Sequence, residues 1–485
     1  MENCNLSSLQ VFVPTSGNPW DVQKAHHIYR RLAFGANPEI IRVALTKTPE
    51  QIIDLLVDEA KNLPTSTAPD WVGKGRLQLI DEGFDFEEIN QVHVREVFAQ
   101  TLKDTRNNNL RAVLALFWHN HFVTQVSEYN CASYLFEYYT ILQKNSLGNF
   151  KEFVREIGLS NAMLVFLNGK TNRKNKPNEN YARELYELFT LGENKGYTQQ
   201  DIEETAKALT GYNKGGYCEK TEFNPTSFNN SEKNIFGRVG NWNYDDAINI
   251  LFEEKASLVA KFIVEKLYKY FVSPDVDMLI VEELAFEFEA DFEIEPMLRN
   301  LFKSEHFFDN KALATLIKSP YDINTNFIKV TNFPVLEEQN LGIYYQNGNA
   351  GQRYFQPVDV AGWQGDYDWI NTSTLTARWD IVMNNVWRTW NEETGDREKF
   401  REFAKAAADG SNDVYEIVRR IIDAFLPMGL NTEANYTDAT DIFKTDFIPS
   451  EYFTNGIWTL DYPNVPWQVV LLFQYLTRLP EFQLK

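Results

Sequence analysis

The chain has 485 residues, a formal net charge of −21, 44% hydrophobic residues and 14% aromatic residues. This length exceeds the usual limit for one compact core, so we expect either two sub-domains or one large layered domain. The charge argues against a nucleic-acid partner and against binding to an anionic membrane surface. Both need clustered Lys and Arg, whereas here the basic residues are interspersed with Asp and Glu.

Residues 1–18 are interpreted as an N-terminal arm and residues 19–485 as a single large helical domain. The arm has no basic stretch followed by an apolar run, so no secretory signal is predicted. The chain has no apolar segment of about 18 residues, so no membrane span is expected. Cys4, Cys131 and Cys218 are odd in number and widely spaced, which predicts neither a disulfide framework nor a metal knuckle. These features favour a cytoplasmic protein.

Helical patterns dominate the chain. The segment TPEQIIDLLVDEAKNL begins with Thr48 as N-cap, Pro49 at the first helical position and Gln51 completing a capping box. Apolar residues follow at helical spacing, and the same pattern recurs along the chain. We expect a mainly α-helical fold, with helices at about 20–33, 49–63, 85–103, 109–126, 132–145, 149–157, 178–191, 199–209, 244–252, 256–271, 276–289, 295–304, 310–330, 375–390, 396–407, 413–425 and 466–478.

The segment LALFWHNHFVTQV, residues 114–126, is apolar nearly all round and is predicted to be buried. His119 and His121 lie two residues apart, about 200° round a helix, so they cannot chelate one metal ion from the same helix. Either each is a core histidine held by hydrogen bonds, or one of them joins a divalent-metal site with a carboxylate such as Glu184. Few other histidines are present, so a three-histidine zinc site has little support.

The stretch PNENYARELYELFTLGENKGYTQQD, which begins at Pro177, carries many polar groups on one predicted helix. Glu179, Arg183 and Glu187 form one stripe at a spacing of four residues. Asn180 and Glu184 form another stripe beside the apolar face. One interpretation is an amphipathic helix with surface ion pairs. The other is that Glu184 and Arg183 reach a buried polar centre.

Two stretches lack helical periodicity. Residues 211–243 are rich in Gly, Asn and aromatic residues, which predicts an insertion that carries β-hairpins. Residues 341–374 predict a long aromatic loop, and long loops inside compact helical proteins are often functional. The loop combines aromatic side chains with three carboxylates, at Asp359, Asp366 and Asp368.

Aromatic side chains beside carboxylates suit a carbohydrate, because sugar rings stack on aromatic faces. Two carboxylates at a suitable distance could also act as acid and base on a glycosidic bond. The alternative is that the aromatic residues only pin the loop onto the helices. The aromatic residues are Tyr344, Tyr345, Tyr354, Phe355, Trp363, Tyr367 and Trp369.

The chain has no glycine-rich phosphate loop after a strand, no nucleophile-elbow serine and no paired Cys–His signature.

Taken in order, several motifs resemble the bacterial family called domain of unknown function 1800. They are HHIYRRLAFGANPEII (26–41), FWHNHF (117–122), NENYAREL (178–185), LFTLG (188–192), GYTQQD (196–201), ALTGY (208–212), KSP (318–320), QPVDVAGWQGDYDWIN (356–371) and LPEFQL (479–484). The resemblance implies a largely α-helical protein. It also implies an envelope location, because family members often carry export signals. Their genes lie beside genes for proteins of presumed sulfatase-like fold, which implies a sulfatase-like protein partner or sulfated glycans.

This chain departs from the family pattern inside the insertion. Family members tend to carry a His-Asp pair shortly before a lysine and a glycine. Here the pair is replaced by Phe228 and Asn229, while Lys233 and Gly237 are kept. If that histidine is a ligand or a base in relatives, its role is altered in this chain.

The leading hypothesis is a hydrolase that acts on an envelope or polysaccharide substrate. Its predicted catalytic residues are Glu184 and Asp359, with His119 or His121 in support. Its predicted substrate-binding residues are Asn178, Glu179, Asn180, Arg183 and Trp363. The cofactor is not specified by the sequence, although a divalent metal would fit one of the histidines.

The alternative hypothesis is a non-catalytic scaffold, or a partner of a sulfatase-like protein at the cell envelope. The character of the surface separates the two hypotheses. An exposed apolar patch on the aromatic loop would favour a partner, whereas a concave polar pocket would favour an enzyme.

Overall fold

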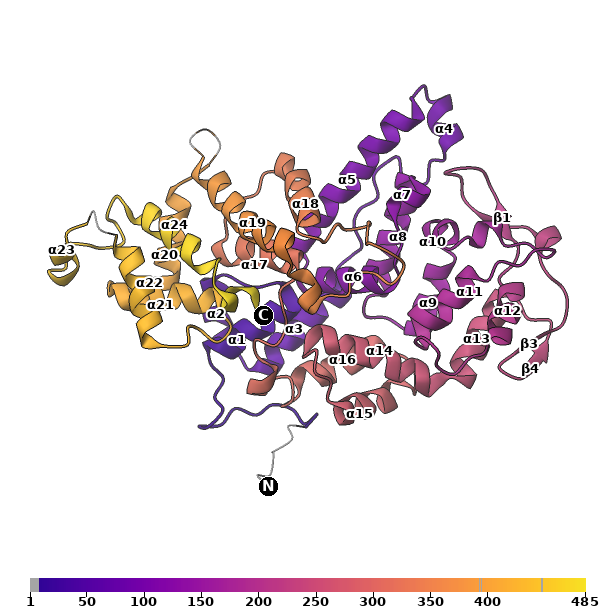
Figure 1. The fold of residues 1–485 in the computed structure, drawn as a ribbon, viewed down its shortest axis with the longest axis horizontal. Coiled ribbons are helices and arrows are strands. Elements are labelled where there is room, and N and C mark those ends of the chain that lie inside the picture. The colour runs from indigo at the N-terminus through magenta and orange to yellow at the C-terminus, as the bar shows by residue number, and fades with distance from the viewer. Residues whose placement is uncertain (1–7, 392, 394, 446–447) are drawn as a thin grey trace.

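The structure is a computed structural model that describes residues 8–391, 393, 395–445 and 448–485. These residues contain 24 α-helices and two small two-stranded sheets, so the prediction of a mainly α-helical fold is confirmed. In Figure 1 the C-terminal helices gather at the left, and the strands with their neighbouring helices lie at the right. Within the described residues, no helix is both long and apolar enough to cross a bilayer.

The helices follow one another with short connections. The first part of the chain forms α1 (Val22–Ala33), α2 (Pro38–Leu45), α3 (Pro49–Asn62), α4 (Arg76–Asp81), α5 (Phe86–Asn107), α6 (Asn109–His121), α7 (Val126–Tyr129), α8 (Ala132–Asn145), α9 (Phe150–Gly158) and α10 (Asn161–Phe166). The middle forms α11 (Asn180–Glu184), α12 (Gln199–Ala208), α13 (Tyr244–Glu254), α14 (Ala256–Phe271), α15 (Met278–Phe288) and α16 (Ile294–Lys303). The last part forms α17 (Pro320–Thr331), α18 (Asn340–Asn349), α19 (Thr372–Trp390), α20 (Glu398–Ala408), α21 (Val414–Phe425), α22 (Glu433–Lys444), α23 (Ser450–Thr454) and α24 (Val465–Leu476).

The helix starts follow the predicted caps. Thr48 Oγ1 accepts from Gln51 N at 3.2 Å and Thr48 N donates to Gln51 Oε1 at 3.0 Å, which confirms the capping box. Two predicted helices were too long. The helix predicted at 109–126 ends at His121, and the one predicted at 310–330 starts only at Pro320. Ser319 caps this second helix, and a proline directly after the cap is a common start signal.

The predicted insertion carries two hairpins. Strands β1 (Tyr212–Lys214) and β2 (Glu222–Phe223) pair antiparallel, with Tyr212 opposite Phe223. Strands β3 (Lys233–Ile235) and β4 (Arg238–Gly240) also pair antiparallel, with Asn234 opposite Val239. The prediction of a hairpin-bearing insertion is confirmed.

The prediction about the cysteines was wrong. Cys131, directly before α8, forms a disulfide with Cys218 in the turn between β1 and β2, across a Cα–Cα distance of 5.5 Å. The two residues are 87 positions apart in sequence, and the insertion folds back over the start of α8 to bring them together. Spacing alone therefore failed to reveal the pair. Cys4 lies outside the described residues.

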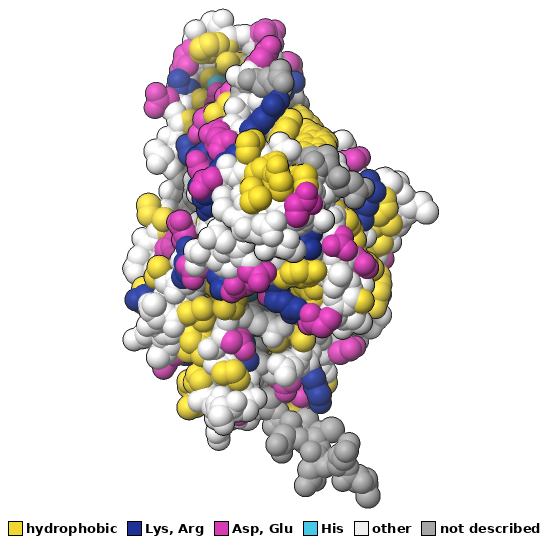
Figure 2. Space-filling model, turned by 90° about the vertical axis from the view of Figure 1, so that its left-hand side faces the viewer, with side chains coloured by type: hydrophobic (Ala, Val, Ile, Leu, Met, Phe, Trp, Pro, Cys, Tyr) yellow, Lys and Arg dark blue, Asp and Glu magenta, His cyan; other side chains and the backbone are white. Residues whose placement is uncertain are grey.

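The hydrophobic core forms two large clusters. The larger cluster gathers buried side chains from residue 9 to residue 369, and the smaller one gathers them from residue 323 to residue 482. Helix α17 supplies both, with Tyr321 and Ile328 in the larger cluster and Phe327 in the smaller one. The single domain predicted for 19–485, with its arm over 1–18, stays a prediction. Figure 2 shows the face of the C-terminal helices, where hydrophobic patches alternate with acidic and basic side chains.

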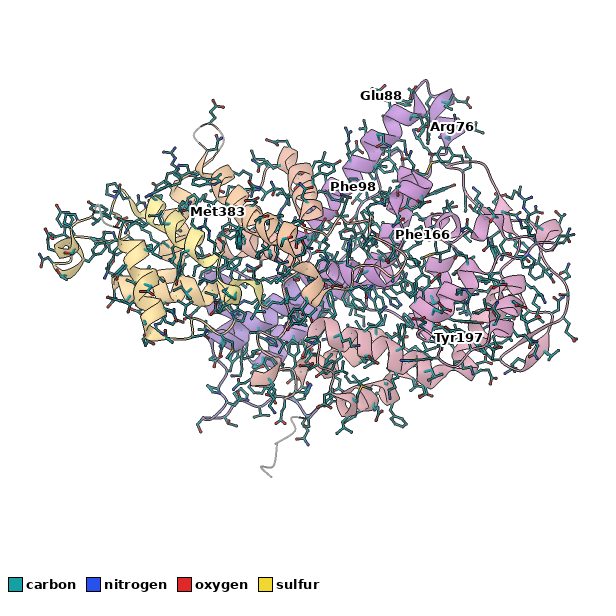
Figure 3. All side chains as sticks on the ribbon, in the orientation of Figure 1. Arg76, Glu88, Phe98, Phe166, Tyr197 and Met383 are labelled. Carbon is teal, nitrogen blue, oxygen red and sulfur yellow. A yellow bond between two sulfur atoms is a disulfide. The ribbon has the colours of Figure 1, made fainter. Side chains whose placement is uncertain are left out.

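The aromatic loop starts later than predicted. Residues 340–349 form α18, where the sequence offered Gly and Asn residues that disfavour a helix. Packing stabilises this helix, because Tyr344 stacks on Phe98 of α5 with ring centroids 4.2 Å apart. Figure 3 labels Phe98 beside α18. The remaining loop runs from Ala350 to a short 3₁₀ turn, Asp366–Trp369, directly before α19.

Candidate active site

The motif helix, which we define as residues 178–190, consists of two non-helical residues, Asn178 and Glu179, followed by α11 and a π-helical turn, Leu185–Thr190. The charged side chains of its first stripe form ion pairs with one another. Arg183 Nη2 lies 3.0 Å from Glu179 Oε2, and Arg183 Nη1 lies 3.5 Å from Glu187 Oε1. Gln199 of α12 joins the group by donating to Glu179 at 2.8 Å. These side chains are only partly buried, so the stripe is a surface ion-pair network rather than a buried centre.

The second stripe of the motif helix behaves differently. Asn178 Oδ1 accepts from Asn180 N at 2.9 Å, and no side chain among the described residues hydrogen-bonds the carboxylate of Glu184. Partial burial raises the pKa of Glu184, and the negative charge of Glu187 raises it further, against the opposing charge of Arg183. Glu184 is therefore a partly buried acid with no direct partner, beside a π-helical turn of the kind often found at functional sites.

A residue that the sequence analysis missed anchors the start of the motif helix. Asn172 is buried, and its Oδ1 accepts from Asn178 N at 2.9 Å while its Nδ2 donates to Ala206 O at 2.9 Å. It thus ties the motif helix to the end of α12. The buried hydrogen bonds at this place come from Asn172, which lies before the motif, and nothing in the local sequence distinguished it from a loop asparagine.

His119 is enclosed by the aromatic loop. Its Nε2 accepts from Phe355 N at 3.0 Å, and its Nδ1 donates to Tyr138 Oη at 2.9 Å, because that hydroxyl itself donates to Phe122 O. Burial lowers the pKa of His119 to about 3. Both ring nitrogens are therefore used by the protein, which leaves a neutral histidine that holds the loop against α6.

His121 points to the other side of α6, as the angular separation of the two histidines predicts. Its Nε2 donates to Phe189 O at 3.0 Å, and its Nδ1 accepts from Lys266 Nζ at 3.1 Å. Burial lowers the pKa of Lys266 to about 8. Within the described residues, no group of three or more His, Cys, Asp or Glu side chains is placed to hold a metal ion. The metal role of His119 and His121 gains no support from this geometry.

The other predicted loop residues lie apart from the motif helix. Trp363 is 6% exposed, and its main chain exchanges two hydrogen bonds with the Asn120 side chain, at 2.7 and 2.9 Å. Its ring packs against His119 with centroids 5.5 Å apart. Asp359 is exposed, and its Oδ1 accepts from Ala361 N at 2.9 Å within a turn. Trp363 therefore pins the loop, and the structure does not bring Asp359 into contact with Glu184.

At the insertion, Phe228 takes part in a local contact with the retained lysine. Lys233 is buried, and its Nζ lies 5.1 Å from the centroid of the Phe228 ring and 2.9 Å from Ser231 O. Asn229 accepts from Ser231 N at 2.9 Å. Phe228 therefore packs against this turn, and Asn229 caps it.

A large cavity of about 890 Å³ lies between the start of α15, the segment after α16 and the end of the aromatic loop. We name it the acidic cavity, because four aspartates and one lysine line it. Its lining comprises Tyr268, Val272, Ser273, Pro274, Asp275, Val276, Asp277, Met278, His306, Asp309, Lys311, Ala312, Ala314, Thr315, Ile317, Asp366, Tyr367 and Leu484. The charge of this lining favours a neutral or cationic ligand over an anionic one.

One wall of the acidic cavity is a fixed hydrogen-bonded group. Tyr268 Oη lies 2.8 Å from His306 Nε2. Burial raises the pKa of Tyr268 to about 12, and a backbone hydrogen bond from Asp277 opposes this effect. Asp277 and Asp309 each use Oδ1 to cap a helical turn, at 3.0 Å from Leu279 N and 2.9 Å from Lys311 N. These groups come from distant parts of the sequence, so only tertiary packing assembles them.

The aromatic loop supplies the opposite wall. Asp366 adopts a left-handed backbone conformation with φ of 49°, which is uncommon outside glycine. Partial burial raises the pKa of Asp366, and the negative charges of Asp275 and Asp368 raise it further, against a backbone hydrogen bond from Tyr367. The next residue, Tyr367, is 80% exposed. The cavity thus combines a carboxyl group with a raised pKa, a second carboxylate nearby and an accessible aromatic ring.

The fold and this cavity define a large α-helical protein with an acidic pocket at the end of its aromatic loop. The chain belongs to the family described as "Protein of unknown function (DUF1800)", whose profile matches residues 27–484, so the predicted family is confirmed. No curated protein and no solved structure matches the chain.

Proposed function

We propose that the protein is a carbohydrate-active hydrolase whose active site is the acidic cavity. The observation that carries this proposal is that Asp366 and Asp275 line the same cavity beside the exposed ring of Tyr367, and the charge of Asp275 helps to raise the pKa of Asp366. Glycoside hydrolysis commonly uses two carboxyl groups, one of which keeps its proton because its pKa is raised. A concave polar pocket also favours the enzyme hypothesis over the scaffold hypothesis.

In this proposal Asp366 is the general acid that protonates the oxygen of the leaving group. Asp275, which is exposed, is the general base: it takes a proton from a water molecule as the water oxygen bonds to the anomeric carbon and the bond to the protonated leaving-group oxygen breaks. Tyr367 stacks on a sugar ring at the cavity mouth, while the hydrogen-bonded pair of Tyr268 and His306 forms a fixed polar wall beside it. The four aspartates favour neutral or amino-bearing sugars and disfavour sulfated ones.

We also infer that the protein works in an oxidising compartment, which is consistent with an envelope location. Support comes from the buried disulfide between Cys131 and Cys218. Disulfides persist in secreted and periplasmic proteins and are rare in a reducing cytoplasm. Quantifying free thiols in protein purified from its native host, with thiols blocked at lysis, tests this inference. Two free thiols at these positions would contradict it.

The test of the hydrolase proposal measures release of reducing sugar from a panel of neutral and amino-bearing oligosaccharides. Asp366→Asn should lower the rate about 10²- to 10⁴-fold, as loss of a general acid does. Its melting temperature should stay within a few degrees of wild type. Asp359→Asn, a matched change in the same loop, should keep full activity. A wild-type protein that cleaves no member of the panel would overturn the proposal.

A further inference from the structure

A second polar region lies deep in the fold, where α1, α17, α19 and residues 483–485 meet. We name it the buried cationic centre. Its five positively charged side chains, all buried, are Arg30, Arg31, Lys318, Arg378 and Lys485. Asp322 lies among them and is also buried. In Figure 1 the end marked C lies at the middle of the molecule, beside α1 and α3.

Side-chain carboxylates neutralise only part of this charge. Lys485 Nζ pairs with both oxygens of Asp322 at 2.8 Å. Arg30 has the charge of Asp423 nearby, although its guanidinium group donates to the main-chain oxygens of Asp423 and Ala424. Among the side chains, five cations therefore face two carboxylates, and the terminal carboxylate of the chain at Lys485 adds a third negative charge. Burying uncompensated charge is costly, so the arrangement requires an explanation.

The remaining cations bind neutral oxygen atoms. Arg31 Nη2 donates to Ala312 O at 2.8 Å and to Thr315 Oγ1 at 3.0 Å. Arg378 donates to Gln483 Oε1 at 2.9 Å and to Lys318 O at 2.6 Å. These contacts position the guanidinium groups but remove none of their charge.

Among the residues that the structure describes, several of these guanidinium nitrogens have no hydrogen-bond acceptor. They are Arg30 Nε, Arg31 Nε, Arg31 Nη1 and Arg378 Nη1, and all are buried. Arg31 is only 1% exposed, so bulk water does not reach its two unpaired nitrogens. A buried donor without an acceptor is rare in folded proteins and usually marks a water molecule or an ion.

The charges lie close enough to influence one another. Burial lowers the pKa of Arg31 to about 9, the charge of Asp322 opposes this effect, and the charge of Arg30 adds to it. Burial also lowers the pKa of Lys318, and the nearby charges of Arg30, Arg378 and Lys485 contribute. Arg31 and Arg378 both donate to main-chain oxygens of the segment 312–318, at Ala312 and Lys318, which brings the two guanidinium groups to the same region of the molecule.

We propose that the buried cationic centre binds a small inorganic anion, held by the unpaired nitrogens of Arg31 and Arg378. An anion would accept hydrogen bonds from these donors and offset the excess positive charge. Chloride and a tetrahedral oxyanion such as phosphate share this chemistry, and arginine suits both. The site is independent of the proposed hydrolase, although Ala312 and Thr315 contact Arg31 and also line the acidic cavity.

Two measurements on the full-length protein test this proposal. Crystals soaked in bromide should show an anomalous peak within hydrogen-bonding distance of Arg31 and Arg378. The melting temperature should rise by about 2 °C or more as chloride replaces gluconate at constant ionic strength, because an anion bound to the native state stabilises it. A parallel series with phosphate distinguishes the two classes of anion.

A matched pair of variants separates a specific site from a general salt effect. Arg31→Lys should abolish the dependence of melting temperature on the anion. Arg111→Lys should keep it, because Arg111 is likewise buried with an unpaired Nη1 but donates to the main chain of Ala60 and Leu63. The proposal would be overturned if no bromide peak appeared and the melting temperature did not change with the anion. An equal response in Arg31→Lys and wild type would also overturn it.

Discussion

The motif helix and the acidic cavity differ in how the sequence encodes them. The motif helix concentrates charged and amide residues within ten positions. However, Glu179, Arg183 and Glu187 form ion pairs with one another and are partly exposed. No single motif encodes the acidic cavity, because the motif at 356–371 supplies only Asp366 and Tyr367 and the other polar groups come from two separate segments. A dense polar motif therefore identified the family, whereas the pocket suited to chemistry emerged only from tertiary packing.

The largest expected effect on stability concerns the disulfide, which holds the insertion to the start of α8 and lies outside the acidic cavity. Replacing both Cys131 and Cys218 by Ser should lower the free energy of unfolding by about 3 kcal/mol, because the unfolded chain regains freedom. Urea unfolding measures this difference. Reductant should destabilise wild type by a similar amount and leave the double variant unchanged. Equal stability of the two proteins would contradict a formed disulfide.

Asn172 and Asn180 test which asparagine supports the motif helix. Asn172→Ala should cost about 2 kcal/mol, because it leaves buried backbone groups of Asn178 and Ala206 without partners. Asn180→Ala should cost less than about 0.5 kcal/mol, because this side chain is only partly buried. Chemical denaturation of both variants checks this prediction. A larger loss of stability from Asn180→Ala than from Asn172→Ala would show that a residue of the motif, and not Asn172, supports this helix.

Glu184 offers a test through pH. Its folded-state pKa is raised, so the folded protein binds this proton more tightly than the unfolded chain does. The charged form is penalised at neutral pH, and the penalty disappears as pH falls below the unfolded-state pKa. Glu184→Gln should therefore raise the melting temperature slightly at pH 7 and leave it unchanged near pH 4. A lower melting temperature at pH 7 would show that the carboxylate has a partner.

The smallest effect is expected for the charged stripe. Arg183→Gln should change the free energy of unfolding by about 0.5 kcal/mol or less, because exposed ion pairs contribute little. Denaturation at low and high salt measures the change, and Arg183→Lys serves as the control that keeps the charge. A loss of several kcal/mol would mean that Arg183 belongs to a buried network after all.

The parts of the fold that were predictable rest on local rules. Thr48 with Gln51 forms a capping box where the sequence placed it, and Thr198 with Asp201 forms another by the same local rule. Helix α18 was missed because its glycines and asparagines disfavour a helix, and its stability comes from the stacking of Tyr344 on Phe98. Local rules cannot anticipate such long-range packing.

The candidate site was predictable only in part. The aromatic loop was identified as a carbohydrate surface, and it supplies Asp366 and Tyr367 to the cavity wall. Tyr268 and His306 were not identified, since they lie 38 positions apart and carry no spacing signal. Trp363, predicted as a stacking surface, is buried because its ring packs against His119.

The central claim is that substrate chemistry belongs to the acidic cavity and not to the motif helix. The most direct test is a crystal structure of Asp366→Asn soaked with a neutral oligosaccharide and, separately, with an amino-bearing one. We expect sugar density stacked on Tyr367, with a glycosidic oxygen next to residue 366. Density beside Glu184 and Asn180, with an empty acidic cavity, would contradict it.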